Sequence, residues 1–163
     1  MDFNPCTKHK AVRKTVRKFA ETELGPISHE IDRDSRFPWE VIEKMGPLQY
    51  FGLQVPQKYG GAALDTISYA ITIEEISRVC AAIGLCVTVH NSVGAYPIVR
   101  FGTEDQKKKF LPLLASGEYI GAFCLTEANA GSDAGAVETI ATYDDGEYVV
   151  NGTKVFVTNG GVC

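Results

Sequence analysis

The sequence has few of the groups that bind metals or nucleic acids. Its three histidines stand apart from any cluster of cysteines or carboxylates, and its five cysteines lack the spacing of a zinc site. An odd number of scattered cysteines is typical of reduced thiols in a reducing compartment. A net charge of −4 at pH 7 gives no basic excess for nucleic acid. We therefore expect a globular protein with no metal ligands and no nucleic-acid partner.

Formal charges are missing from one long stretch, residues 79–99. Its length would allow it to cross a bilayer. It contains Gly84, His90, Asn91 and Pro97, however, which are too polar or too disruptive for a lipid-facing helix. We expect a buried helix here and no membrane span.

Acidic residues are absent from the first basic segment. Six lysines and arginines lie between Lys8 and Lys18, a pattern that also occurs in transit peptides and membrane-surface helices. The segment lacks serine and a large apolar face, and its helical period runs on until Gly25 and Pro26. This favours an ordinary first helix with a solvated basic face.

Signals for helix ends organise the next hundred residues. Pro38 is suitably placed near the start of a second helix, and Asp65 is a plausible N-cap for a third. Thr103 and Gln106 have the spacing of a capping box. That last helix ends at Ser116 and Gly117, which predicts an all-helical N-terminal domain over residues 1–118.

The apolar period changes from 3.6 to 2 near residue 119. Alternation predicts a leading strand at 120–124 and strands at 139–143, 147–150 and 154–158, with hairpin turns at Asp145-Gly146 and Asn151-Gly152. The fold class is therefore α+β, with the first strands of an antiparallel β-domain over residues 119–163. A chain end soon after Thr158 leaves one sheet edge unpaired, so we expect part of this domain to be missing.

Two glycine-rich segments carry the functional signal. The first, residues 123–135, reads FCLTEANAGSDAG, and the second, residues 154–161, reads KVFVTNGG. Further matching stretches are VPQKYGG at 55–61 and FGTEDQK at 101–107. In this order they resemble the acyl-CoA dehydrogenase family, in particular its short-chain and butyryl-CoA members. The resemblance covers nearly the whole chain, which is truncated relative to the family.

The resemblance assigns cofactor contacts to six residues. It implies that the first segment lies along a flavin ring, with the hydroxyl of Thr126 on its pyrimidine edge. Ser132 would reach the pyrophosphate and lie beside bound acyl-CoA, Phe156 would cover a ring face, and Thr158 would bond near N5. Taken alone, Thr126 and Ser132 would be ordinary turn or cap residues. The implied FAD-binding residues are Phe123, Leu125, Thr126, Ser132, Phe156 and Thr158, with Ser132 also binding substrate.

Two positions depart from the family pattern. Ala128 stands where proline is common, and Phe156 stands where tryptophan is common. The family's catalytic glutamate belongs to a C-terminal part beyond this chain, so no residue is assigned as catalytic, Glu127 included. The isolated chain is accordingly predicted to be inactive.

The function implied by the resemblance is FAD-dependent oxidation of short-chain acyl-CoA to the 2,3-enoyl-CoA in fatty acid metabolism. Electrons would pass to an electron-transfer flavoprotein, and the protein would be a homo- or hetero-oligomer. The alternatives are a flavin acyl-CoA oxidase, and a non-catalytic fragment or partial subunit that needs a second chain. The implied location is the cytoplasm of a bacterium or archaeon, or the mitochondrial matrix of a eukaryote.

Overall fold

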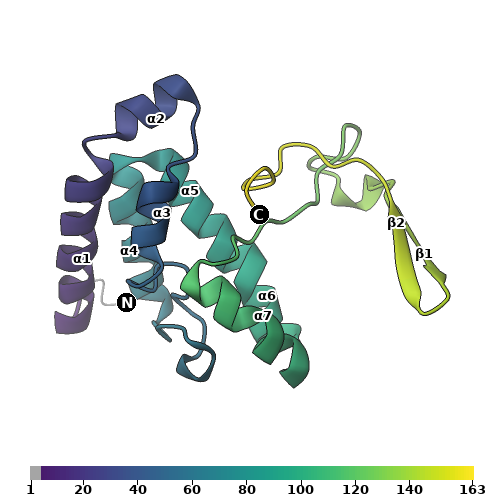
Figure 1. Ribbon diagram of the computed structural model, residues 1–163, viewed down its shortest axis with the longest axis horizontal. Coiled ribbons are helices and arrows are strands. Elements are labelled where there is room, and N and C mark those ends of the chain that lie inside the picture. Colours follow the sequence, from purple (N-terminus) through teal and green to yellow (C-terminus); the bar gives the residue numbers. More distant parts are fainter. Residues whose placement is uncertain (1–4) are drawn as a thin grey trace.

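A computed structural model describes residues 5–163 and places helices first and a β-hairpin last (Figure 1). The first helix, α1 (Thr7–Phe19), continues through a π-helical turn to Leu24, where Gly25 follows as predicted. A short helix over Ser28–Asp34 was not predicted. This unpredicted helix is α2. The remaining helices are α3 (Trp39–Met45), α4 (Thr66–Val79), α5 (Ala81–Val89), α6 (Tyr96–Phe101) and α7 (Glu104–Ser116).

The helical part has one main apolar core between α1, α3, α4 and α5. Leu24, Met45, Phe51 and Ile76 are fully buried there. Burying a side chain of this size contributes about 1.5–3 kcal/mol relative to leaving it exposed. The core therefore fixes α1 along α4 and gives the candidate site a rigid support.

The basic face of α1 is only partly solvated, which corrects the sequence-based expectation. Arg13 and Arg17 both bond the carboxylate of Glu75 on α4, with 2.8 Å between Arg17 Nε and Glu75 Oε2. The Glu75 side chain is 1% exposed, and a buried carboxylate is stable only when paired. Helical periodicity in α1 could not show this, because the partner lies on a distant helix.

The uncharged stretch is a broken, partly buried helix. Cys80 separates α4 from α5 with extended backbone angles, and a π-helical segment, His90–Ala95, joins α5 to α6. The run Ala81–Phe101 has a mean hydropathy of 1.3 and is 39% buried. It is long and apolar enough to cross a membrane, a property that it shares with core helices of soluble proteins. The expected burial is thus confirmed for one side of the helix only.

The predicted helix ends are confirmed. Asp65 Oδ1 accepts from Ser68 N at 2.8 Å, so it is the N-cap of α4. Thr103 and Gln106 bond reciprocally as a capping box at the start of α7. Gly117 ends that helix with φ +79°, a conformation that glycine adopts without strain.

The β region contains fewer strands than predicted. Asp145 and Gly146 turn the antiparallel hairpin of β1 (Ile140–Asp144) and β2 (Glu147–Asn151), as expected, and every residue of both strands is exposed. The hairpin projects away from the helices (Figure 1). Segments 120–124 and 154–158 form no strand, and Asn151-Gly152 turns no hairpin. Positive φ angles at Phe156 and Asn159 interrupt the extended backbone that alternation had suggested.

Candidate functional site

The two glycine-rich segments lie side by side, although neither is a strand. The Val155 amide donates to the Thr126 carbonyl over 2.9 Å. Lys154 Nζ also donates to the Leu125 carbonyl, at 2.9 Å. These two bonds bring together the stretches that contain Phe123, Leu125 and Thr126 on one side and Phe156 and Thr158 on the other.

Glu127 is the polar centre that holds this junction. Its carboxylate accepts from Lys154 Nζ at 2.7 Å, from the Glu138 amide at 2.7 Å, and from both the amide and the hydroxyl of Thr139. The bond from Lys154, followed by that from the Thr139 hydroxyl, lowers the pKa of Glu127 to about 2. A carboxylate held by four donors is a poor proton acceptor, so Glu127 positions the loop and is no general base.

The site is tied to the helices through Asn159 and His90. Asn159 Nδ2 donates to the carbonyls of Cys86 and Gly121, at 3.3 and 3.0 Å. The Gly121 amide donates to His90 Nδ1 at 2.8 Å, and His90 Nε2 lies 3.0 Å from the Phe51 carbonyl. An acceptor at Nδ1 and a donor at Nε2 define a neutral imidazole. Burial lowers the pKa of His90 to about 4, which keeps that form in place.

The predicted flavin-binding side chains are presented outward. Phe123 is 48% exposed, Leu125 41% and Phe156 95%. Thr126 and Thr158 are half-buried. Exposed apolar side chains next to hydroxyl groups are the residue types that suit a planar ring with a polar edge. Ser132 is exposed, and no hydrogen bond within residues 5–163 joins it to the other five residues.

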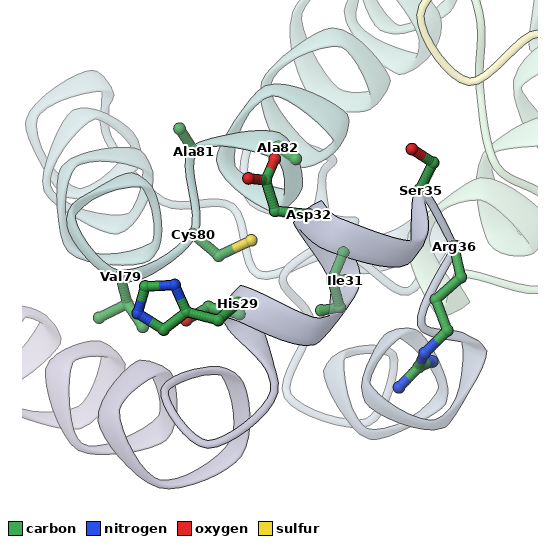
Figure 2. A pocket seen from close by; sticks show the side chains of 10 residues that line it. His29, Ile31, Asp32, Ser35, Arg36, Val79, Cys80, Ala81 and Ala82 are labelled. Atoms are coloured by element: carbon green, nitrogen blue, oxygen red, sulfur yellow. The ribbon is translucent and has the colours of Figure 1, made fainter.

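Two cavities lie near these elements. An apolar hollow of about 270 Å³ separates α5 from the second segment, with Cys86 and Ile83 facing Val157 and Asn159. A cleft of about 470 Å³ lies between α2 and the α4–α5 junction (Figure 2). In that cleft His29, Asp32 and Arg36 point in different directions, and Arg36 is paired with Glu30 and Glu40. The first cavity borders the candidate site, whereas in the second these three side chains do not converge on one point.

Sequence reasoning missed the residues that hold the site. Glu127 and Lys154 lie in the two quoted segments, and their opposite charges are the signal that could have paired them. His90 and Asn91 stood out in the sequence as polar residues that do not suit a lipid-facing helix, and they were given no role in the site. The structure uses Asn91 internally, since its amide donates to the Tyr50 and Val87 carbonyls and its oxygen accepts from the Leu53 amide.

The helical domain and its adjoining loops match known families over almost their whole length. Residues 7–118 match the acyl-CoA dehydrogenase N-terminal domain, and residues 122–163 match the acyl-CoA dehydrogenase middle domain. The sequence therefore contains regions of both the N-terminal and the middle domain of this family. This chain belongs to the acyl-CoA dehydrogenase family.

Curated relatives cover the chain at high identity. The short-chain specific acyl-CoA dehydrogenase of Clostridium acetobutylicum is 49% identical over all of this chain and 43% of its own length. The mitochondrial short-chain enzyme of Bos taurus is 44% identical over 93% of this chain and 37% of its own. The 3-(aryl)acrylate reductase of Clostridium sporogenes is 42% identical, with coverage of 93% and 40%. The chain thus spans about two fifths of the length of these relatives.

Solved structures agree with this fold. Butyryl-CoA dehydrogenase from Megasphaera elsdenii has a TM-score of 0.92 at 40% identity, over 99% of this chain and 43% of its own. A chain in the electron transferring flavoprotein structure of Acidaminococcus fermentans has a TM-score of 0.94 at 40% identity, with coverage of 98% and 42%. An FAD complex of an acyl-CoA dehydrogenase from Bacillus anthracis has a TM-score of 0.86 at 38% identity, over 97% of this chain and 27% of its own.

Proposed function

We propose that this chain is the N-terminal portion of an FAD-dependent enzyme that oxidises short-chain acyl-CoA to the 2,3-enoyl-CoA. The observation that carries the proposal is the Val155–Thr126 backbone bond, which joins the two segments assigned to the flavin. Relatives named as short-chain enzymes in a bacterium and in mitochondria support the substrate class. A neighbour solved with FAD supports the cofactor.

In this proposal the chain's residues bind and orient, and they carry no proton transfer to substrate. Phe123, Leu125 and Phe156 offer apolar surface to the isoalloxazine ring, while Thr126 and Thr158 donate hydroxyl bonds to its polar edge. Ser132 contacts the pyrophosphate and the acyl-CoA. FAD, when bound, supplies the hydride acceptor. Glu127 and Lys154 fix the spacing of the two segments that would hold the ring.

The proposal extends to partners and location. An electron-transfer flavoprotein as acceptor is supported by the neighbour of that description, and a homo- or hetero-oligomer is proposed with it. The location follows the relatives, either bacterial cytoplasm or mitochondrial matrix. We propose residues 1–118 and 119–163 as the two domains.

A second candidate is reduction of an arylacrylate, because a relative at 42% identity bears that name. An acyl-CoA oxidase uses the same cofactor and differs in its electron acceptor. A non-catalytic fragment or partial subunit would bind no flavin. Flavin absorbance of the whole protein separates the two kinds of enzyme from a fragment that binds no flavin. Butyryl-CoA should bleach the flavin of a dehydrogenase or an oxidase, and oxygen should then restore the colour rapidly only in an oxidase, whereas an arylacrylate should restore the colour of flavin that a reductant has already bleached in an arylacrylate reductase.

Thr158→Val in the whole protein tests the assigned hydroxyl. The change keeps the side chain's shape and removes one hydrogen bond, which is typically ~0.5–1.5 kcal/mol. We expect slower flavin reduction by butyryl-CoA, roughly 2- to 10-fold, with the fold unchanged. Thr153→Val, at an exposed position before the same segment, is the matched control. Equal reduction rates in the wild type and both variants would contradict the role of Thr158.

A further inference from the structure

Cys6, His9 and Asp65 form a hydrogen-bonded chain of side chains at the start of α1, away from the candidate flavin site. Cys6 Sγ lies 3.3 Å from His9 Nδ1, and His9 Nε2 lies 3.1 Å from Asp65 Oδ1. The three residues come from two elements, because Cys6 is the N-cap of α1, His9 lies in the first turn of that helix, and Asp65 is the N-cap of α4.

Each member of this cluster is suited to one role. Cys6 is exposed to solvent. The side chain of His9 is only 12% exposed, so the surrounding protein holds its ring between the sulfur and the carboxylate. Asp65 Oδ2 also accepts from Lys8 Nζ at 2.8 Å, and Oδ1 accepts from the Ser68 amide. These bonds, that of Lys8 foremost, hold the pKa of Asp65 well below its usual range.

The three side chains contact one another in a line, thiol to imidazole to carboxylate. This arrangement suits the transfer of a proton from the thiol to the imidazole and does not suit the binding of a metal ion. A carboxylate on Nε2 orients the imidazole so that Nδ1 presents its lone pair to the thiol, as in cysteine nucleophiles paired with histidine. A metal site would instead need three ligand atoms that converge on one point, and no such group occurs among the described residues. The N-terminus of the 13-residue helix α1 adds positive potential beside the sulfur.

We propose that Cys6 is a reactive thiol that forms mixed disulfides with low-molecular-weight disulfides. The thiol proton passes to His9 Nδ1, and the thiolate attacks one sulfur of the disulfide. The Cys6–S bond forms as the S–S bond of the reagent breaks, so Cys6 is oxidised and half of the reagent leaves as a reduced thiolate. That leaving group takes the proton back from His9.

The chain supplies its own comparison for this reactivity. Cys124 and Cys163 are also exposed, and neither sulfur has a hydrogen-bond partner in the part of the chain that the structure describes. An ordinary cysteine is only a few per cent thiolate at neutral pH. Transfer of the thiol proton to His9 during the attack is therefore expected to speed exchange at Cys6 by roughly tenfold over the other two.

The test is a time course of the 163-residue chain with glutathione disulfide at neutral pH, read by peptide mass spectrometry. Mixed disulfide is expected to appear at Cys6 about tenfold faster than at Cys124 or Cys163. His9→Gln keeps a polar side chain of similar reach but cannot accept the proton. The rate of mixed-disulfide formation at Cys6 should therefore fall to that of the other two cysteines. His29→Gln, at an exposed histidine outside this cluster, should leave the rate unchanged.

Asp65→Asn separates the carboxylate's charge from its capping role, because asparagine also caps helices. It should slow the exchange at Cys6 while the circular dichroism of the chain stays the same. The proposal is overturned if Cys6 reacts no faster than Cys124 and Cys163. It is equally overturned if a folded His9→Gln or Asp65→Asn chain reacts at Cys6 as fast as the wild type.

Discussion

Single residues decide how the two glycine-rich segments meet. Glu127 lies next to a proposed flavin contact, where a carboxylate could be mistaken for a base. Its four donors, Lys154 among them, give it a positioning role instead. The same donors make its ionisation a direct readout of whether the junction is assembled.

The carboxyl titration of Glu127 is therefore a first prediction. Followed by NMR, the midpoint should lie near 2, compared with an ordinary value of 4.5. Because the pKa is lower in the folded chain, the ionised carboxylate stabilises the fold above about pH 4.5, and this contribution is lost as the pH falls toward 2. Lys154→Met should move the midpoint upward, while Lys108→Met, on exposed α7 surface, should not. A wild-type midpoint near 4.5 would contradict the described junction.

His90 gives a second prediction at the residue scale. Its pKa is about 4 in the folded chain and 6.5 in the reference state, so the unfolded chain binds a proton first as the pH falls. The free energy of unfolding should thus drop by about 2 kcal/mol between pH 7 and pH 5. The other strongly shifted groups contribute little in this window, because the carboxylates titrate below it and Tyr50 and Cys86 titrate above it. Urea unfolding of the His90→Gln chain should lack this drop, whereas His29→Gln should retain it.

Elements depend on local signals at their ends and on tertiary contacts along their length. The helix α7 shows the first clearly, since Thr103 and Gln106 satisfy each other's backbone amides and Gly117 closes the helix. The hairpin illustrates the importance of tertiary contacts along an element, because its strands are not covered by other elements. Tyr143 and Tyr148 stack edge to face, with 5.1 Å between their ring centroids, yet every residue of both strands remains exposed.

The capping box of α7 can be tested by Thr103→Ala. Loss of the bond from Thr103 Oγ1 to the Gln106 amide should lower the free energy of unfolding by about 1 kcal/mol. Urea denaturation of the chain measures this change. Thr15→Ala, at an exposed interior position of α1, is the control and should cost nothing. A loss of similar size in both variants would show that the capping geometry is not responsible.

At the scale of the whole molecule, the chain is two fifths of the length of its curated relatives. Large apolar side chains remain uncovered at the end of α6 and in the candidate site. Phe101 is 82% exposed and Phe156 95%. Surfaces of this kind are usually covered by other protein or by a ligand.

The isolated chain is predicted not to turn over acyl-CoA. Its residues are assigned to binding only, and general-base catalysis contributes roughly 10²–10⁴-fold in rate. The measurement is dye reduction with butyryl-CoA and added FAD, with the whole protein as the positive control. An ordinary enzymatic rate from the purified 163-residue chain would contradict this prediction. Activity that appears on adding a second chain, one that supplies the part of the relatives this chain does not cover, would support it.

The sequence by itself predicted much of the helical part, because helix ends depend on neighbours within four residues. Asp65, Thr103 and Gly117 act locally, so the residues beside them in the chain are enough to indicate their roles. The hairpin at Asp145-Gly146 was predictable for the same reason, since its turn needs positive φ at both positions. The family likewise followed from the order of residues in the two glycine-rich segments.

Only the tertiary structure decided which distant groups meet. Alternation at 154–158 predicted a strand, but a strand needs a ladder of partners, and only the Val155 amide pairs with the first segment. The pairing of Arg13 and Arg17 with Glu75, like that of Glu127 with Lys154, joins residues far apart in sequence. Periodicity records which face of an element is apolar and contains no information on which charged group lies across from it. The contacts that hold the candidate site are of this second kind.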